Sequence, residues 1–213
     1  MLDDNNLRMK KLKTSLLTIL MVIIWLTNAS AVSMKDLWFS LPDSMIPYLD
    51  AKKRTECIDM YRLKLKAKNA LGGETAIDTI TGNYLSATLS NNSILQMRRI
   101  LSSNADSLVC VVRTFWGPVK DSKVTVFTTK WKEVCNVQFK IDDFTHKPDT
   151  MNTELYEKTK KMLDPYMFFA KLNPKDDTLT VEVTVTGVSE EENNTINDII
   201  LQRKLNWNGK CFN

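Results

Sequence analysis

Residue types that could perform acid–base or metal chemistry are present in this sequence, but they are scattered. His146 is the single histidine, so a Ser–His–Asp or Cys–His arrangement would have to use it, and no nucleophile has the sharp strand-to-helix turn that such sites favour. A zinc site would need further ligands at motif spacing, which the isolated cysteines and acids lack. We interpret His146 as a loop histidine, and we expect no catalytic triad and no metal.

Adjacent acidic residues are the next candidates for chemistry. They occur at Asp142-Asp143, at Asp176-Asp177 and over residues 190–192. Paired carboxylates serve glycoside hydrolysis, and carboxylate oxygens suit calcium. Each group coincides with an expected turn or helix start, where acids are favoured for local reasons. A structural role is therefore the preferred interpretation, and an envelope hydrolase that uses carboxylates near Asp142 and Asp143 is the alternative.

One aromatic residue is a candidate for binding rather than catalysis. Trp116 stands at the mouth of a turn-rich loop over residues 117–122. Exposed aromatic side chains anchor many interfaces, so Trp116, Asp121 and Ser122 form the predicted contact patch for a partner. The alternative is that Trp116 closes one end of the core. The double glycine at residues 72–73 lacks the rest of a phosphate-binding loop, and we expect no cofactor.

The N-terminal segment has the pattern of an export signal. Four basic residues precede an apolar run over residues 16–26, which is short for a membrane span and suits a signal peptide. Residues 29–31 (Ala-Ser-Ala) have the small-x-small form that signal peptidase reads, so cleavage after Ala31 is predicted. An uncleaved anchor is the alternative, and Met9 is an alternative start. After cleavage we expect no stable membrane span.

Charge argues against nucleic acid as a partner. Removing residues 1–31 takes away four basic and two acidic residues, which lowers the formal net charge from +4 to +2. A nucleic-acid-binding domain should carry a stronger and clustered basic footprint. The basic residues here are concentrated over residues 52–68, which we interpret as the solvent-exposed face of one helix.

The cysteines bear on the compartment and on stability. Cys57, Cys110, Cys135 and Cys211 remain after signal cleavage, and an exported location permits disulfides. Four cysteines allow three pairings, and the sequence does not choose among them. Cys57 and Cys110 lie inside apolar patterns, which favours buried free thiols. A disulfide-stabilised structural protein stays open as another function.

A central antiparallel hairpin is the element around which the fold is expected to form. Residues 108–115 are almost continuously apolar and β-branched, as in a strand that is buried on both faces. The loop over residues 117–122 leads to a second strand, in which residues 124–131 alternate between two faces. We expect the rest of the chain to pack on this hairpin.

A helix and several short strands are predicted before the hairpin. The helix spans residues 50–70, begins at Asp50 as its N-cap and ends at the double glycine. Short strands at residues 76–80, 84–89 and 94–101 are separated by turn signals, which indicates an antiparallel meander. The last of these strands is expected to be short or at an edge, because its alternation is imperfect.

The C-terminal part is predicted to contain two helices and a hairpin. Residues 132–149 have a weak pattern, and we interpret them as a long connection. A helix over residues 153–163 is followed by a hairpin of residues 166–172 and 178–186, whose second arm alternates cleanly. A capping box at residues 189–192 starts the last helix.

Several segments carry a family signature: LWFSLPDSMIPYL, TECIDMYR, the LGG stop, SLVCVVRTFWGP with the DSKV turn and the later Trp131, LDPYM, and LNWNGKCF. Through these segments the chain over residues 34–212 resembles a family of uncharacterised exported proteins from Bacteroidales, classed as a domain of unknown function. The resemblance implies a Gram-negative envelope location. It carries no activity and no site residues, because that family has neither assigned.

These patterns together predict an α+β fold: a mostly antiparallel β-sheet with helices packed on one face. We expect a signal peptide over residues 1–31 and a single domain over residues 32–213. A subdivision into residues 32–131, with a helix and the main sheet, and residues 150–213, with helix, hairpin and helix, is the alternative. The predicted function is that of an exported, non-enzymatic periplasmic or envelope binding module, whose partner is an unknown envelope protein or component.

Overall fold

The computed structural model describes residues 32–213, so the predicted signal peptide lies outside the described residues. Within them, Ser33–Asn213 form one compact unit, and no helix is long and apolar enough to cross a membrane. The helical elements are α2 (Met34–Phe39), η1 (Asp43–Met45), α3 (Ala51–Arg62), η2 (Ile141–Phe144), α4 (Thr153–Lys161) and α5 (Glu190–Asn197). The strands are β1 (Ala67–Lys68), β2 (Glu74–Ile80), β3 (Tyr84–Ser90), β4 (Ser93–Leu101), β5 (Ser107–Trp116), β6 (Lys120–Thr128), β7 (Glu133–Val137), β8 (Tyr166–Leu172), β9 (Thr178–Val185) and β10 (Arg203–Asn206).

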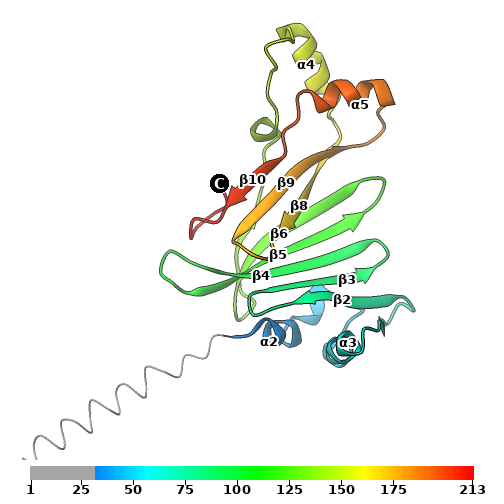
Figure 1. The fold of residues 1–213 in the computed structure, drawn as a ribbon, viewed down its shortest axis with the longest axis vertical. Coiled ribbons are helices and arrows are strands. Elements are labelled where there is room, and N and C mark those ends of the chain that lie inside the picture. Colours follow the sequence, from blue (N-terminus) through cyan, green and yellow to red (C-terminus); the bar gives the residue numbers. More distant parts are fainter. Residues whose placement is uncertain (1–31) are drawn as a thin grey trace, which may run out of the picture. The chain divides into compact units, whose positions relative to one another are not determined.

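The strands form two antiparallel sheets (Figure 1). The larger sheet has seven strands in the order β1-β2-β3-β4-β5-β6-β7, so each strand pairs with the next one along the chain. The smaller sheet has the order β10-β9-β8. Short turns suffice to connect antiparallel neighbours, which is why turn signals between alternating runs lead to this meander. The predicted α+β class with a mostly antiparallel sheet is confirmed.

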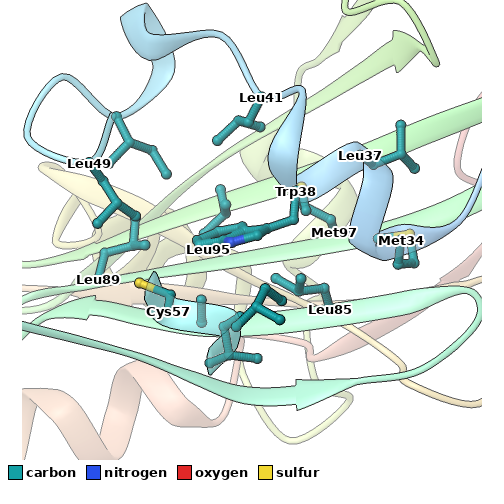
Figure 2. Close-up of a cluster of buried hydrophobic side chains, with 14 of the residues drawn as sticks. Met34, Leu37, Trp38, Leu41, Leu49, Cys57, Leu85, Leu89, Leu95 and Met97 are labelled. Atoms are coloured by element: carbon teal, nitrogen blue, oxygen red, sulfur yellow. The ribbon is translucent and has the colours of Figure 1, made fainter. Parts of the chain in front are cut away.

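The N-terminal helices cover one face of the larger sheet. Trp38 of α2 and Cys57 of α3 belong to one buried cluster with Leu85 and Leu95 of the sheet (Figure 2). The indole Nε1 of Trp38 donates to the backbone oxygen of Arg54 at 2.9 Å, which ties α2 to α3. Packing of helices on one face of the sheet was predicted and is confirmed.

The smaller sheet packs against the opposite face of the larger one. In β5, Val109 and Val111 belong to the helix-side cluster, whereas Cys110 and Val112 share a second cluster with Val181 of β9. Successive side chains of a strand point to opposite faces, so β5 is buried between the helices and the smaller sheet. The predicted two-sided burial of this strand is confirmed.

Side chains of the larger sheet hydrogen-bond one edge of β8. Within the described residues β8 pairs only with β9, so its other edge lacks ladder partners. The Ala170 N–H donates to Ser122 Oγ at 3.0 Å, and the Leu172 N–H donates to Gln96 Oε1 at 3.2 Å. These side-chain bonds satisfy two N–H groups of the edge that has no neighbouring strand, and they join the two sheets.

The same contacts explain why the prediction for β4 was wrong. β4 is nine residues long and lies between β3 and β5, although it was expected to be short or at an edge. Gln96 and Arg98 interrupt its apolar pattern because they are buried polar residues with partners. The Arg98 Nε lies 2.6 Å from an Asp177 carboxylate oxygen, and Gln96 Nε2 donates to the Tyr84 hydroxyl at 2.8 Å.

The helix predicted over residues 50–70 begins as expected but ends earlier. Asp50 is its N-cap, because the carboxylate accepts a hydrogen bond from the Lys53 N–H at 2.8 Å. The helix ends at Arg62, and Lys64 has a positive φ of 59°.

Beyond that turn the chain forms a strand instead of more helix. Ala67 of β1 pairs with Thr75 of β2. Gly72, with φ 78°, therefore belongs to the connection between β1 and β2 and does not cap the helix. The apolar residues of this segment happen to follow helical spacing, and the exposure of Leu63 and Leu65, at 64% and 57%, shows that they do not form a buried helical stripe.

The segment predicted as a long connection contains an unpredicted strand. β7 pairs with β6, and η2 follows it, both within residues 132–149. Three residues of β7 are exposed and the other two are half-buried, so its apolar pattern is weak. The later elements agree better with the sequence: α4, the β8–β9 hairpin and the capping box of Ser189 with Glu192 at α5 are confirmed.

Candidate functional site

The predicted contact residues lie at the β5–β6 hairpin, whose turn is shorter than expected. The turn covers residues 117–119, so the prediction of a loop over residues 117–122 was wrong. Asp121 and Ser122 instead extend β6 and pair with β5. The sequence could not show that these two residues belong to a strand, because an Asp-Ser pair is also typical of turns.

The structure does not bring the three predicted residues onto one surface. Trp116 is opposite Lys120 in the ladder, and Asp121 is opposite Phe115, so Trp116 and Asp121 point to different faces. Ser122 shares the face of Trp116, but its hydroxyl is engaged with the backbone of β8. Asp121 is exposed on the face opposite to that of Trp116, whereas Trp116 and Ser122 are half-buried.

The ring of Trp116 lies in a small cluster that also contains a second aromatic ring and a lysine. The Lys120 Nζ lies 5.6 Å from the ring centroid of Trp116 and 4.5 Å from that of Phe169. Cation–π contacts of this kind favour an ordered lysine. We call Trp116, Lys120 and Phe169 the Trp116 patch.

The acidic pair of the hydrolase alternative lies in η2 on the surface. The Asp142 side chain is 72% exposed, and its Oδ1 lies 2.5 Å from Lys160 Nζ. This hydrogen bond with Asp142 raises the pKa of Lys160. Asp143 is exposed and lines a cavity of about 270 Å³ together with Arg203. Because a catalytic acid is usually held in a dry pocket, this placement does not favour acid–base chemistry.

The cysteines are not joined to one another, although Cys135 packs against the buried cluster that contains Cys110 and the nearby Cys211 contributes to the raised pKa of Cys135. All four described cysteines are free, with Cys57 and Cys110 buried as predicted, and burial raises the pKa of Cys57 to about 11. The structure therefore contains no disulfide that would support the stapled alternative in residues 32–213. His146 is exposed. In this part of the chain no group of three or more His, Cys, Asp or Glu residues could hold a metal ion.

A wide concavity of about 770 Å³ lies at one end of the larger sheet. Three segments line it: residues 102–108, which connect β4 to β5 and begin β5, residues 128–134 around the β6–β7 turn, and residues 207–210 of the C-terminal loop. Lys130 and Lys132 line it from the turn, and Lys210 lines it from the loop. We call this concavity the lysine trough.

The β6–β7 turn holds two of the lysines in an ordered backbone. The Thr128 hydroxyl accepts hydrogen bonds from the N–H groups of Lys130 and Lys132 at 3.3 and 3.2 Å. Between these lysines Trp131 adopts a positive φ of 62°, and its Nε1 donates to Ser40 Oγ at 3.1 Å on the helix side of the sheet. The turn is thus held by hydrogen bonds within itself and by one hydrogen bond to the segment that follows α2.

The C-terminal loop forms another wall of the trough and is hydrogen-bonded to the end of β4 and to the β4–β5 loop. Trp207 Nε1 donates to the Leu101 backbone oxygen at 2.6 Å, and the Ser103 N–H donates to the Gly209 oxygen at 3.0 Å. The ring of Trp207 packs on Phe212, with centroids 5.2 Å apart. Both walls of the trough are therefore held by hydrogen bonds and ring packing, as a binding site requires.

The trough carries net positive charge. Lys130, Lys132 and Lys210 are exposed, and none of them forms an ion pair within the described residues. Asp106 is the single acidic residue of the lining. Lysines without carboxylate partners attract anions into a concave surface, where the protein walls focus the field.

Sequence reasoning missed this site. Two lysines, Lys130 and Lys132, come from the β6–β7 turn, whereas Trp207 and Lys210 come from the segment after β10, so these residues meet only once both sheets are formed. The one local signal is the Lys-Trp-Lys triplet at residues 130–132, and such a triplet does not differ from the sequence of an ordinary solvent-exposed turn.

Comparisons with known proteins bear on the fold and the family. A solved structure described as a domain of an uncharacterised protein from Porphyromonas gingivalis W83 is similar, with a TM-score of 0.70 and 24% identity over 84% of this chain and 98% of that chain. At this identity the likeness shows the fold alone. No curated protein matches the chain. The family model described as "Protein of unknown function (DUF3256)" matches residues 26–212, which confirms the predicted resemblance: the chain belongs to this family of proteins of unknown function.

Proposed function

We propose that the mature chain is an exported, non-enzymatic binding module of a Gram-negative cell envelope, and that the lysine trough is its ligand site. The N-terminal basic and apolar pattern with Ala-Ser-Ala at residues 29–31 supports export. The trough is the observation that carries the binding role. Its volume of about 770 Å³ falls within the range of about 300–1,000 Å³ that is usual for small-molecule sites.

The arrangement of the trough supports binding rather than turnover. It offers cations, hydroxyls and apolar surface on ordered walls, and one exposed carboxylate, that of Asp106. A catalytic carboxylate is usually held in a dry pocket, whereas that of Asp106 is exposed.

Retention of envelope components by immobilised protein tests this proposal. We expect residues 32–213 to retain a component of envelope extract, and the double variant Lys130→Glu with Lys132→Glu to retain about tenfold less, since two cations become anions at the site. The matched control is Lys52→Glu with Lys175→Glu, which changes the net charge equally at exposed positions outside the trough. Equal retention by all three proteins would contradict the assignment of the site.

The Trp116 patch is the second candidate contact surface. Its lysine lies over two aromatic rings, and aromatic residues with an adjacent cation are common at interface centres. Trp116→Ala belongs in the same experiment. If Trp116→Ala loses the retained component and the trough variant keeps it, the patch is the contact surface and the trough is not.

Export has its own test. The full chain, produced in a Gram-negative host, is expected in the periplasmic fraction with Val32 as its first residue, because signal peptidase cuts after the small-x-small pattern. Recovery of the uncut chain from the cytoplasm would contradict the proposal.

A further inference from the structure

We infer that the lysine trough binds an acidic saccharide of about disaccharide size through its carboxylates. This inference rests on the proposed function, because it names the ligand class of the same site. The trough is partly open to solvent, so one side of a bound ligand stays in contact with water. An open site suits a ligand that is hydrophilic on its exposed side and does not suit a fatty acid, which needs an enclosed apolar cavity.

The lysines that line the trough come from two different segments of the chain. Lys130 and Lys132 stand on the β6–β7 turn, and Lys210 stands on the C-terminal loop. A ligand that contacts both segments therefore encounters a cation on each of them, which suits a ligand with two charges. A disaccharide with one carboxylate on each ring has its charges distributed in this way.

The remaining charged groups argue against a dense phosphate ligand. No arginine lines the trough in the described residues, so the planar fork that binds phosphate through two hydrogen bonds is missing there. Asp106 lies in the lining and repels a concentrated anion. The same carboxylate can accept hydrogen bonds from saccharide hydroxyls.

The uncharged lining fits the two kinds of surface of a sugar ring. Leu108, Val134 and Trp207 supply apolar area, and Asn104 and Thr129 supply hydrogen-bonding groups beside it. Aromatic residues with a polar edge are suited to sites where one side of the ligand is apolar and the other is wet. A sugar presents C–H groups on its faces and hydroxyls on its rim, which matches this division.

Calorimetric titration with digalacturonic acid is the test, alongside the neutral disaccharide of galactose and inorganic phosphate. We expect digalacturonic acid to bind residues 32–213, and the neutral sugar to bind about tenfold or more weakly, because it lacks the groups that meet the lysines. Lys130→Gln with Lys132→Gln should weaken binding of the acid by about tenfold, while Lys52→Gln with Lys175→Gln should leave it unchanged. These lysines are exposed, so folding, checked by circular dichroism, should be preserved in all variants.

Each other result overturns the inference. If digalacturonic acid does not bind, or binds no better than the neutral sugar, the ligand is not an acidic saccharide. If phosphate binds as tightly and displaces the acid, the trough is a simple anion site. If the lysine variants bind as the parent does, the sugar occupies another surface.

The two proposals fail in different ways. Should the trough variants lose the envelope component while digalacturonic acid fails to bind, the ligand class is wrong and the binding site stands. Should the trough variants keep that component, the proposed function itself fails at this site.

Discussion

Ser122 shows how a single side chain can join two sheets. Its hydroxyl lies 2.9 Å from the Thr114 hydroxyl within the larger sheet and accepts the Ala170 N–H of the smaller sheet at 3.0 Å. Gln96 does the same for Leu172. The buried polar residues between the sheets are thus occupied in satisfying a strand edge, since an unpaired backbone N–H in a dry interface is costly.

Removal of the Ser122 hydroxyl therefore has a predictable cost. We expect Ser122→Ala to lower the free energy of unfolding by about 1–3 kcal/mol, because the Ala170 N–H loses its acceptor. Urea denaturation followed by circular dichroism measures this change. Asp121→Ala, at an exposed position on the same strand, is the control and should stay within about 0.5 kcal/mol. A Ser122→Ala protein as stable as its control would show that water replaces the hydroxyl.

The cysteines should differ sharply in reactivity toward a thiol reagent. Cys211 is exposed and should react in the native state at pH 8, whereas Cys57 and Cys110 are buried and should react only after unfolding. Burial raises the pKa of both buried thiols, that of Cys57 to about 11, and the thiolate is the reactive form. Labelling of Cys110 in the native protein as fast as Cys211 would contradict the described burial.

The same shift predicts a loss of stability in alkali. Folding favours the neutral thiol of Cys57, so its contribution is complete below the ordinary pKa of 9.0 and is lost as the pH rises toward about 11. Above pH 9 the unfolded chain binds fewer protons than the folded one, which makes the free energy of unfolding fall with pH. Urea midpoints of the parent and Cys57→Ala at pH 8 and 10 measure this. The parent should lose more stability than the variant, and equal losses would assign the alkaline effect to other groups.

At the scale of elements, the C-terminal loop depends on one glycine. Gly209 has φ 92°, and a Cβ there would lie 2.9 Å from the backbone nitrogen of Ser103. Gly209→Ala should therefore push the loop away from the β4–β5 loop, lower the free energy of unfolding by about 1–3 kcal/mol and weaken ligand binding at the lysine trough.

Gly82→Ala is the matched control for this substitution. A Cβ at Gly82 meets open space, and its φ lies outside the left-handed region, so the substitution should be neutral or slightly stabilising. Urea denaturation and proteolysis of the C-terminal loop compare the two variants. If Gly209→Ala resists proteolysis as well as Gly82→Ala does, the loop tolerates the added atom and the close approach is not decisive.

Elements with a strong apolar pattern could be predicted from the sequence, and elements without one could not. β5 was predicted from a nearly continuous apolar and β-branched run, and β9 from the two-residue period of its apolar residues. β7 was missed because it is an exposed edge strand, where burial imposes no pattern. α3 was predicted too long because the chain turns at Lys64, which has a positive φ. Such a turn is usually signalled by a glycine, and this position has none.

The candidate site was less accessible to sequence reasoning than the fold. Trp116 was chosen for its place beside a turn, and it does lie at the end of β5. The lysine trough, in contrast, combines turns that are remote in sequence, and its lysines look like ordinary solvated residues until the strands are placed. A site made by turns of one sheet end becomes visible only once the strand order is known.

At the scale of the whole molecule, β5 is common to both packing interfaces. The helices contact one face of the larger sheet and the smaller sheet contacts the other, and side chains of β5 belong to both buried clusters. We therefore expect the described unit to unfold in one transition, with no separate stability for the alternative subdivision into residues 32–131 and 150–213.

Two truncations test this coupling. Leu85→Ala lies on the helix side and Leu179→Ala lies in the smaller sheet, and both side chains are fully buried. Each should lower the free energy of unfolding by about 2–5 kcal/mol. Circular dichroism and tryptophan fluorescence in urea should give one shared midpoint for each variant. Two separate midpoints with Leu179→Ala would indicate that residues 150–213 melt independently.

The chain-order pairing of the larger sheet also has a consequence for how the protein is made. Every hairpin from β2 to β7 can close as soon as its second strand has been synthesised, because contacts close in sequence form early. The strands of the smaller sheet come last. Until these strands are present, the face of β5 that carries Cys110 and Val112 is exposed to solvent. The incomplete chain is therefore prone to aggregate until β8, β9 and β10 cover this apolar face.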